Sequence, residues 1–402
     1  MRVSSTSRLA ALVAVALSSV GICGASSAVA FKAKRSQAQA TLFVNGSGLS
    51  GYGHDGCSQA KYTTIAAAVA AAAPHSRIIV CPGTYQEDVT VAKALTIQGI
   101  HAIVDATGLV NGFVVPTLGA GTQIEGFTIE NAIGEGVRAV NTSGLRIAGN
   151  RIEGNDKGTS QPNTYGECIV SAQNPVPDCG EGVRLMGTSY SHVIDNTIRG
   201  NSGGVLMTDE TGPTHGNVVA DNKVLDNTDD CGITLAGHNP AGAPGGVPNP
   251  TAGGVYDNVI ADNVATGNGI AGQGGGVLLA AGIPIGGGAV YDNTVVGNFL
   301  EGNGLAGVTL HNHNPGQDLN GNEIVHNVIK TNNLDGDPDF FPVLDPSTTG
   351  VFVGTAGSPL TVTIEHNLIE SNAVGIFLTG PLNTSEIEHN VFVAVTTDVV
   401  GP

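Results

Sequence analysis

The feature that most constrains the fold of this chain is a pair of asparagines, five residues apart, that recurs from about residue 145 onward. The complete pairs are Asn150/Asn155, Asn196/Asn201, Asn222/Asn227, Asn263/Asn268, Asn298/Asn303, Asn327/Asn332 and Asn367/Asn372, and Asn390 opens a truncated copy. Successive copies lie 23 to 46 residues apart, so the shortest spacing gives the basic unit and longer spacings contain insertions. Such self-similarity is typical of a solenoid, whose stacked units bury a core that no unit buries alone.

A short strand pattern of Gly, apolar, any residue, apolar follows each complete pair. Examples are Gly182-Val183-Arg184-Leu185, Gly232-Ile233-Thr234-Leu235 and Gly307-Val308-Thr309-Leu310. Alternation along a strand puts the apolar side chains inside and the residue between them outside. Asparagines of stacked units then lie above one another, where their amides can hydrogen-bond as in other in-register ladders. This pattern predicts an all-β fold, a right-handed parallel β-helix; in the alternative, a globular sandwich, the strands would not share an asparagine phase.

The segment before the repeats has its own signature: Tyr62-Thr63-Thr64-Ile65, an Ala-rich stretch, then Arg77 to Tyr85 with the sequence RIIVCPGTY. With this opening, the chain resembles the secreted bacterial β-helix-repeat proteins of the pectin-lyase-like superfamily from about residue 41 to the end. The resemblance implies that this segment starts the solenoid. Thr63 or Thr64 can cap a short helix that ends before Pro74, and this helix can cover the open edge of the first coil.

The N-terminus reads as a targeting segment. Arg2 and Arg8 flank the start of an apolar run over residues 9–22, and Ala28-Val29-Ala30 fits a cleavage site. We expect a signal peptide over 1–30, an N-terminal segment with the capping helix over 31–75, and the parallel β-helix over 76–402. The alternative, a membrane anchor, conflicts with an apolar run shorter than a spanning helix. We therefore expect a secreted or extracellular protein, on the bacterial cell surface, with no membrane span after cleavage.

Charge and cysteines limit the partners and the compartment. Acids outnumber bases 34 to 16, which argues against a nucleic-acid partner, since nucleic-acid binders have clustered Lys and Arg. An oxidising compartment permits disulfides. Cys168 and Cys179 flank a turn-rich stretch and read as a loop staple, and Cys57 and Cys81 flank the first helix and strand and could form another. Cys231 is then left over, most simply as a small buried side chain.

Resemblance to the superfamily places candidate sites on the outer face of the sheet formed by the Gly-apolar strands. The residues two positions after the glycine are candidate substrate-binding residues, and they include Arg184, Thr234, Thr309, Phe352 and Phe377. Glu210 and His238 share a column in consecutive coils, and His311 and His313 share a strand face, so these four are candidate catalytic residues. A carboxylate beside an imidazole suits acid–base work, and two imidazoles on one face can chelate a transition metal.

A simpler interpretation of these histidines is that they are repeated turn residues. Residues 234–240 and 309–315 are related copies, each with a histidine before Asn-Pro. Asp318 follows the second copy and could position a histidine of that copy without contacting a ligand itself.

A separate acidic run suggests a metal. Asp335, Asp337 and Asp339 are spaced by two, which suits calcium because calcium prefers several oxygens. The full EF-hand pattern is absent, and a solvated acidic loop is the alternative. Calcium is the one cofactor that the sequence suggests.

The fold does not choose a function, since the superfamily contains lyases, hydrolases, epimerases, tailspikes and non-catalytic surface proteins. We expect a secreted protein that engages extracellular polysaccharide or a cell-envelope glycan, as a glycoside hydrolase or polysaccharide lyase. The alternative is a non-catalytic cell-surface or adhesion solenoid, favoured by acidic, Gly/Asn-rich coils and poor matches to catalytic motifs. A third hypothesis is a metal-handling protein like the β-helix factor of nitrous-oxide-reductase maturation, which only the His-x-His supports.

Overall fold

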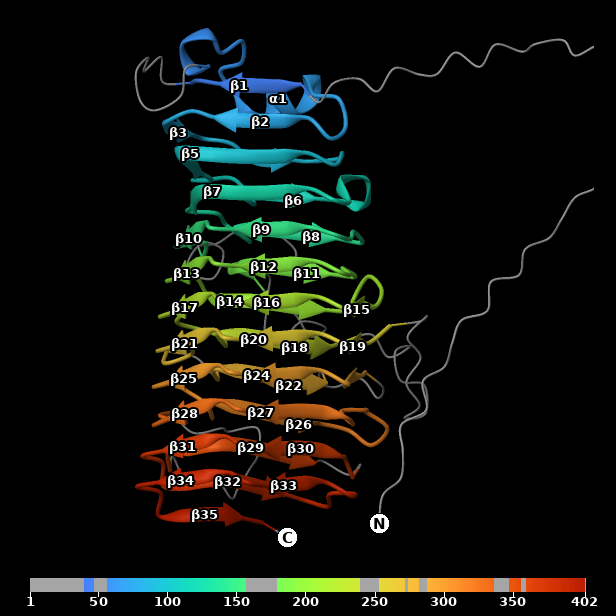
Figure 1. The fold of residues 1–402 in the computed structure, drawn as a ribbon, viewed down its shortest axis with the longest axis vertical. Coiled ribbons are helices and arrows are strands. Elements are labelled where there is room, and N and C mark those ends of the chain that lie inside the picture. Colours follow the sequence, from blue (N-terminus) through green and yellow to red (C-terminus); the bar gives the residue numbers. More distant parts are fainter. Residues whose placement is uncertain are drawn as a thin grey trace, which may run out of the picture. The chain divides into compact units, whose positions relative to one another are not determined.

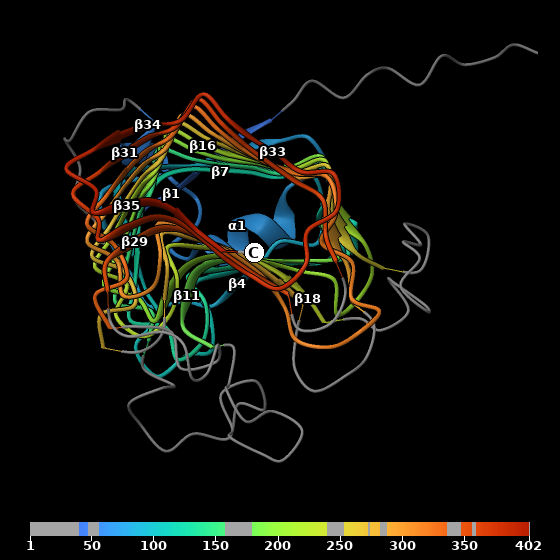
Figure 2. The ribbon, with the colours of Figure 1, turned by 90° about the horizontal axis from the view of Figure 1, so that it is seen from below.

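The computed structural model describes residues 40–46, 56–156, 179–238, 253–271, 274–281, 288–335, 347–355 and 359–401. These residues form a right-handed parallel β-helix, in which each coil stacks on the previous one and neighbouring strands run parallel (Figure 1). Viewed along the stack, strands of successive coils superpose, and the one α-helix of the described residues lies at the far end (Figure 2). The predicted fold is confirmed.

Each repeated coil has three strands, and the two ladder asparagines stand at the corners between them. The first strands are β9 (Arg146–Ala148), β12 (His192–Ile194), β16 (Val218–Ala220), β20 (Val259–Ala261), β24 (Thr294–Val296), β27 (Asn322–Val325), β30 (Val362–Glu365) and β33 (Glu386–Glu388). The second strands are β10 (Arg151–Glu153), β13 (Thr197–Arg199), β17 (Lys223–Leu225), β21 (Val264–Thr266), β25 (Phe299–Glu301), β28 (Val328–Lys330), β31 (Leu368–Glu370) and β34 (Val391–Val393). With β1 (Thr41–Val44), β2 (Arg77–Val80), β3 (Gly83–Tyr85), β5 (Thr96–Asp105) and β7 (Gln123–Glu130), they form a 21-stranded sheet that bends at the asparagines.

The third strands form an 11-stranded sheet, here called the third-strand sheet. Its members are β4 (Val89–Thr90), β6 (Phe113–Val115), β8 (Val137–Val140), β11 (Glu181–Met186), β14 (Gly203–Thr208), β18 (Ile233–Gly237), β22 (Val277–Ala281), β26 (Val308–Asn312), β29 (Thr349–Thr355), β32 (Val374–Thr379) and β35 (Thr397–Val400). A third, small sheet consists of β15 (Thr214–His215), β19 (Val255–Tyr256) and β23 (Val290–Tyr291). Each of its strands follows a strand of the third-strand sheet in the sequence.

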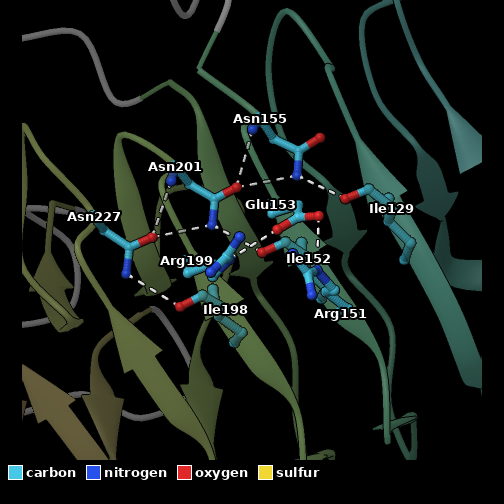
Figure 3. Close-up of polar contacts among 9 residues, drawn as sticks. All are labelled: Ile129, Arg151, Ile152, Glu153, Asn155, Ile198, Arg199, Asn201 and Asn227. Carbon is cyan, nitrogen blue, oxygen red and sulfur yellow. Dashed lines mark hydrogen bonds and ion pairs between the residues drawn. The ribbon is translucent and has the colours of Figure 1, made fainter.

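The asparagines form buried ladders along the stack, as the repeat predicts. Figure 3 shows one segment, in which the backbone N–H and side-chain Nδ2 of Asn155 both donate to Oδ1 of Asn201, at 3.0 and 3.1 Å. Asn201 repeats these two bonds to Asn227, at 3.1 and 3.0 Å, and its Nδ2 also donates to the Ile152 carbonyl at 3.2 Å. An amide can accept two bonds from one coil and also donate two bonds, one more than a hydroxyl can donate, which explains why asparagine recurs at the corner.

The core is the apolar interior of the coils. Val183 and Leu185 are fully buried and pair in register with Val205 and Met207 of the next coil. The same register continues through the third-strand sheet, so side chains of one kind stack in columns. Parallel strands buried on one face and joined at short corners hold every column at one strand spacing from the next.

The N-terminal end is closed by α1 (Ile65–Ala71), a helix that packs on the first coils. The Thr64 side chain accepts from the Ala67 N–H, and the Glu87 carboxylate accepts from the N–H groups of Ile65 and Ala66 at 2.7 and 2.8 Å. These bonds satisfy donors that a helix start leaves open. The strand β1 precedes the helix in sequence and pairs in parallel with β2.

The described residues contain one of the two expected disulfides and the expected unpaired cysteine. Cys57 and Cys81 form a disulfide, and Cys231 is a buried free thiol. Cys168 of the second expected pair lies outside the described residues, as does the expected signal peptide. Of the helices in the described part of the chain, none has the length and apolar character needed to cross a bilayer.

Candidate functional site

The five predicted substrate-binding residues lie in one column of the third-strand sheet. Register places the five, with Leu206 and Leu278 between them, in the order Arg184, Leu206, Thr234, Leu278, Thr309, Phe352 and Phe377 from β11 to β32. All five are buried, from 1% exposed for Arg184 to 9% for Phe377. The alternation predicts the direction of these side chains, whereas their burial shows that this face is largely closed to solvent along the column.

Arg184 is the centre of a buried charge cluster. Its guanidinium contacts the Glu135 carboxylate at 3.3 Å and the Glu210 carboxylate at 2.9 Å. Arg138 lies directly beside Arg184 in the register and reaches Glu135 at 4.0 Å. Glu135 and Arg184 are almost inaccessible, while the Glu210 side chain is 29% exposed. A buried guanidinium needs such opposite charges, because removing either partner leaves an uncompensated ion.

Sequence reasoning missed Glu135 and Arg138, although a signal was present. Gly136-Val137-Arg138-Ala139 has the Gly-apolar-x-apolar pattern one coil before the first complete asparagine pair. Extending the pattern upward places Arg138 in the column of Arg184. Glu135 stands just before that glycine, in a turn whose direction the pattern does not predict.

The structure brings Glu210 and His238 together. His238 Nδ1 lies 3.8 Å from a Glu210 oxygen and 3.0 Å from the Thr208 hydroxyl. The His238 backbone N–H donates to the buried Asp209 carboxylate at 2.8 Å, which fixes the loop that carries the ring. Both side chains are about 30% exposed, at 31% for His238 and 29% for Glu210, so a ligand can reach this carboxylate–imidazole pair.

His311 lies on β26 and His313 directly follows that strand, and the two form a second pair. The strand β22 separates β26 from β18, the strand that precedes His238. The ring centroids of His311 and His313 are 4.5 Å apart. Burial lowers the pKa of His311 well below its usual range, and the neighbouring His313 lowers it further, so His311 is neutral at pH 7. The four candidate catalytic residues therefore lie as two pairs rather than as one cluster.

The loop after β26 orients His313. Its Nδ1 lies 2.5 Å from the Ala281 carbonyl oxygen, an acceptor, so Nδ1 carries the proton and donates. The Gln317 amide oxygen accepts from the backbone N–H groups of His313 and Asn314, at 2.6 and 2.9 Å. In the same loop, the Asp318 carboxylate accepts a hydrogen bond from the Asn320 backbone N–H at 2.9 Å.

A protein-family model described as "Periplasmic copper-binding protein (NosD)" matches residues 119–333, which is more than half of the chain. The matched range contains the Glu210–His238 pair and the His311–His313 pair. This chain belongs to the NosD family. A search of curated proteins finds no match.

Several solved structures are similar to this NosD-family chain. An alginate lyase from Paenibacillus sp. is 13% identical with a TM-score of 0.51, covering 81% of this chain and 95% of that one. A pectate lyase is 15% identical (TM-score 0.45, 87% and 79% covered), and the A-module of a mannuronan C-5 epimerase from Azotobacter vinelandii is 16% identical (0.42, 84% and 91%). At 13% identity the likeness to the alginate lyase is one of fold alone.

The remaining predicted site residues of this NosD-family protein are separate from both pairs. Phe352 and Phe377 have ring centroids 5.8 Å apart and form a small buried apolar cluster with Ala306, so they pack rather than present a platform. Asp335 is described, and partial burial raises its pKa. Asp337 and Asp339 lie outside the described residues, so the calcium site stays a prediction.

A polar hollow of about 340 Å³ lies at the corner after the second strands, and the sequence reading did not identify it. It is lined by Glu130, Asn131, Glu153, Gly154, Arg199, Gly200 and Asp226. Glu153 accepts from Nε of Arg151 at 2.7 Å and of Arg199 at 2.8 Å (Figure 3). These bonds lower the pKa of Glu153, whereas burial and the nearby Asp105 and Glu153 raise that of Glu130.

Proposed function

We propose that this protein works outside the cytoplasm and binds copper at His311 and His313. The observation that carries the proposal is the pair of imidazoles at the end of β26, with ring centroids 4.5 Å apart, inside the range that the NosD family model matches. The Cys57–Cys81 disulfide supports the compartment, because structural disulfides persist in oxidising surroundings. The family is described as periplasmic and copper-binding.

The donor chemistry fits this ion. Imidazole nitrogen is a ligand that copper accepts readily. A metal-ligating histidine commonly donates its other ring N–H to a carbonyl or carboxylate, and His313 has this arrangement, with Nδ1 on the Ala281 carbonyl and the lone pair on Nε2. His311 is neutral because burial lowers its pKa, so copper need not displace a proton from it.

The test is copper titration of the untagged mature protein, with Cu(II) and with Cu(I) under reducing conditions. We expect the double variant His311→Ala/His313→Ala to bind at least about tenfold more weakly at this site. His192→Ala, which changes an exposed histidine on β12, is the matched control and should bind as the parent does. Equal affinity in the parent and the double variant would overturn the proposal.

A second candidate function is engagement of polysaccharide at the Glu210–His238 pair. A carboxylate 3.8 Å from an imidazole, both partly exposed, has the residue types that acid–base chemistry on a sugar needs. A net charge of −18 repels polyanions, and the Arg184 charge is already opposed by Glu135 and Glu210, so a neutral glycan is the better substrate class.

This second function is tested by incubating the protein with neutral and acidic polysaccharides, with and without calcium. Reducing ends and the ultraviolet absorbance of unsaturated sugars are followed together. New reducing ends that disappear in Glu210→Gln support a hydrolase, and added unsaturation supports a lyase. Binding without turnover supports the non-catalytic surface solenoid, and neither binding nor turnover rejects this candidate.

A further inference from the structure

The residue before the first ladder asparagine forms a column of its own along the outside of the solenoid. In the last three coils this residue is His326, His366 and His389, here called the histidine ladder. All three are exposed and have left-handed backbone, with φ of 57°, 56° and 54°. Their rings stack almost parallel: centroids of His326 and His366 are 5.0 Å apart, and those of His366 and His389 are 4.9 Å apart.

The buried asparagine ladder holds this stack in place. The Asn327 N–H donates to the Asn367 side chain at 2.9 Å, and the Asn367 N–H donates to the Asn390 side chain at 3.0 Å. Each histidine directly precedes one of these asparagines in the sequence. The rings are therefore held at one coil spacing by the core.

The fold itself does not need histidine here. Earlier coils have other residues at the same position, namely Gly149, Asp195, Asp221, Asp262 and Gly297. Aspartate and glycine satisfy the left-handed corner equally well. The left-handed backbone conformation therefore does not explain why histidine occupies this position in three successive coils.

Carboxylates accompany the two last rings. Glu365 and Glu388 end the paired strands β30 and β33 and lie opposite one another in register. His389 Nδ1 lies 3.8 Å from a Glu388 oxygen. Ligand atoms of Glu365, Glu388 and His389 all lie within 4.8 Å of one another.

We propose that the histidine ladder, with Glu365 and Glu388, is a surface site for a divalent transition-metal ion, and that Cu(II) binds it most tightly. Nitrogen and oxygen ligands at about 2.0 to 2.2 Å from an ion lie at most some 4 Å apart. Exposed side chains within 4.8 Å reach that separation by small rotations. Imidazole with carboxylate suits divalent ions, among which Cu(II) forms the tightest complexes.

The site is distinct from the proposed copper pair at His311 and His313 and does not depend on it. That pair lies at the end of β26 in the third-strand sheet, and its first ring is buried. The ladder is exposed and lies at the corner between first and second strands. The ladder also combines nitrogen with carboxylate oxygen. The two sites should therefore be separable by mutation.

The experiment is a Cu(II) titration of the untagged mature protein, followed by calorimetry and by the nitrogen couplings in the electron paramagnetic resonance spectrum. The test variant is His366→Asn/His389→Asn, because asparagine adopts the left-handed corner and should leave the coils folded. His101→Asn is the matched control, since His101 is exposed with φ of 48° near the opposite end of the solenoid. A second variant, Glu365→Gln/Glu388→Gln, keeps all three rings.

We expect affinity at this site to fall at least about tenfold in the asparagine variant and less in the glutamine variant. The control and His311→Ala/His313→Ala should keep the site, with its nitrogen couplings. Unchanged binding in His366→Asn/His389→Asn would overturn the proposal, as would loss of all Cu(II) binding in His311→Ala/His313→Ala. Loss only in the ladder variant would support it and reject the proposed site at β26.

Discussion

At the scale of single residues, a ladder asparagine in the middle of the stack joins three coils. Asn222 is buried; its Oδ1 accepts from the Asn196 N–H and Nδ2, both at 3.0 Å, and its Nδ2 donates to the Val193 carbonyl and to Asn263 at 2.8 and 3.0 Å. Removing the amide takes away the side-chain partner of the buried Asn196 N–H and of the Val193 carbonyl, which costs more than the net value of one hydrogen bond. The ladder therefore specifies register as well as adding stability.

We predict that Asn222→Ala lowers the free energy of unfolding by about 2 to 4 kcal/mol, as measured by urea unfolding. Asn383→Ala is the control, since Asn383 is exposed and has a 3.5 Å bond to the Pro359 carbonyl. The control should change stability by less than about 0.5 kcal/mol. Equal effects of the two substitutions would contradict this role.

Two facing carboxylates at the polar hollow predict opposite pH effects. Arg151 and Arg199 lower the pKa of Glu153, so its stabilisation is present above the unfolded pKa and is lost as pH falls through the folded one. Burial raises the pKa of Glu130, so its ionised form is destabilising at neutral pH. We expect Glu153→Gln to lower stability at pH 7 and Glu130→Gln to raise it, each by under about 1 kcal/mol.

Both effects should fade as pH falls to about 3, where carboxylates become protonated. Thermal unfolding at pH 7 and at pH 3 measures them, and each variant serves as the control for the other. Changes of the same sign, or changes that do not depend on pH, would contradict the electrostatic explanation.

At the scale of elements, the glycine at the start of the Gly-apolar-x-apolar pattern marks a close approach between coils. A Cβ on Gly276 would lie 2.6 Å from the Gly307 carbonyl oxygen, and one on Gly350 would lie 2.6 Å from the Gly375 oxygen. The neighbouring atom is backbone and cannot rotate away. This steric reason explains why the strand pattern begins with glycine.

We predict that Gly276→Ala costs about 1 to 3 kcal/mol through overpacking. Gly302→Asn is the control, because a Cβ there meets nothing within 4 Å and asparagine tolerates its φ of 67°. Urea unfolding of both variants checks this. A stable Gly276→Ala would show that the coils can separate to accept a methyl group.

The Cys57–Cys81 disulfide stabilises the N-terminal elements, closing a loop across a sequence separation of 24. We predict that Cys57→Ala/Cys81→Ala removes about 3 kcal/mol. Because each coil contacts only its neighbours, the loss should appear in hydrogen exchange at β1 and α1 and leave β18 to β26 protected. Uniformly faster exchange would instead indicate that the whole solenoid unfolds as one unit.

At the scale of the whole molecule, the sequence predicts the fold and the columns well. The asparagines carry the same signal in every coil, and strand alternation correctly orders Arg184, Thr234 and Thr309 in one column. Alternation gives the direction of a side chain and not what lies beyond it, so the burial of this column could not be predicted. Glu135 was missed because it lies in a turn.

The histidine ladder could be predicted from the sequence only after the repeats are aligned. His-Asn occurs at 326–327, 366–367 and 389–390, so its signal is visible in the sequence. The steps of 40 and 23 residues hide the relation between these dipeptides until the insertions are set aside. Reading the residue beside each repeated asparagine, as well as the asparagine itself, would have found the column.

The measurement that tests the copper account most directly is equilibrium dialysis of the untagged protein against copper, followed by metal analysis of the protein. The account predicts copper bound at both histidine sites, reduced by His311→Ala/His313→Ala, reduced independently by His366→Asn/His389→Asn, and abolished when the four changes are combined. A parent protein that retains no copper, or a combined variant that retains as much as the parent, would contradict it.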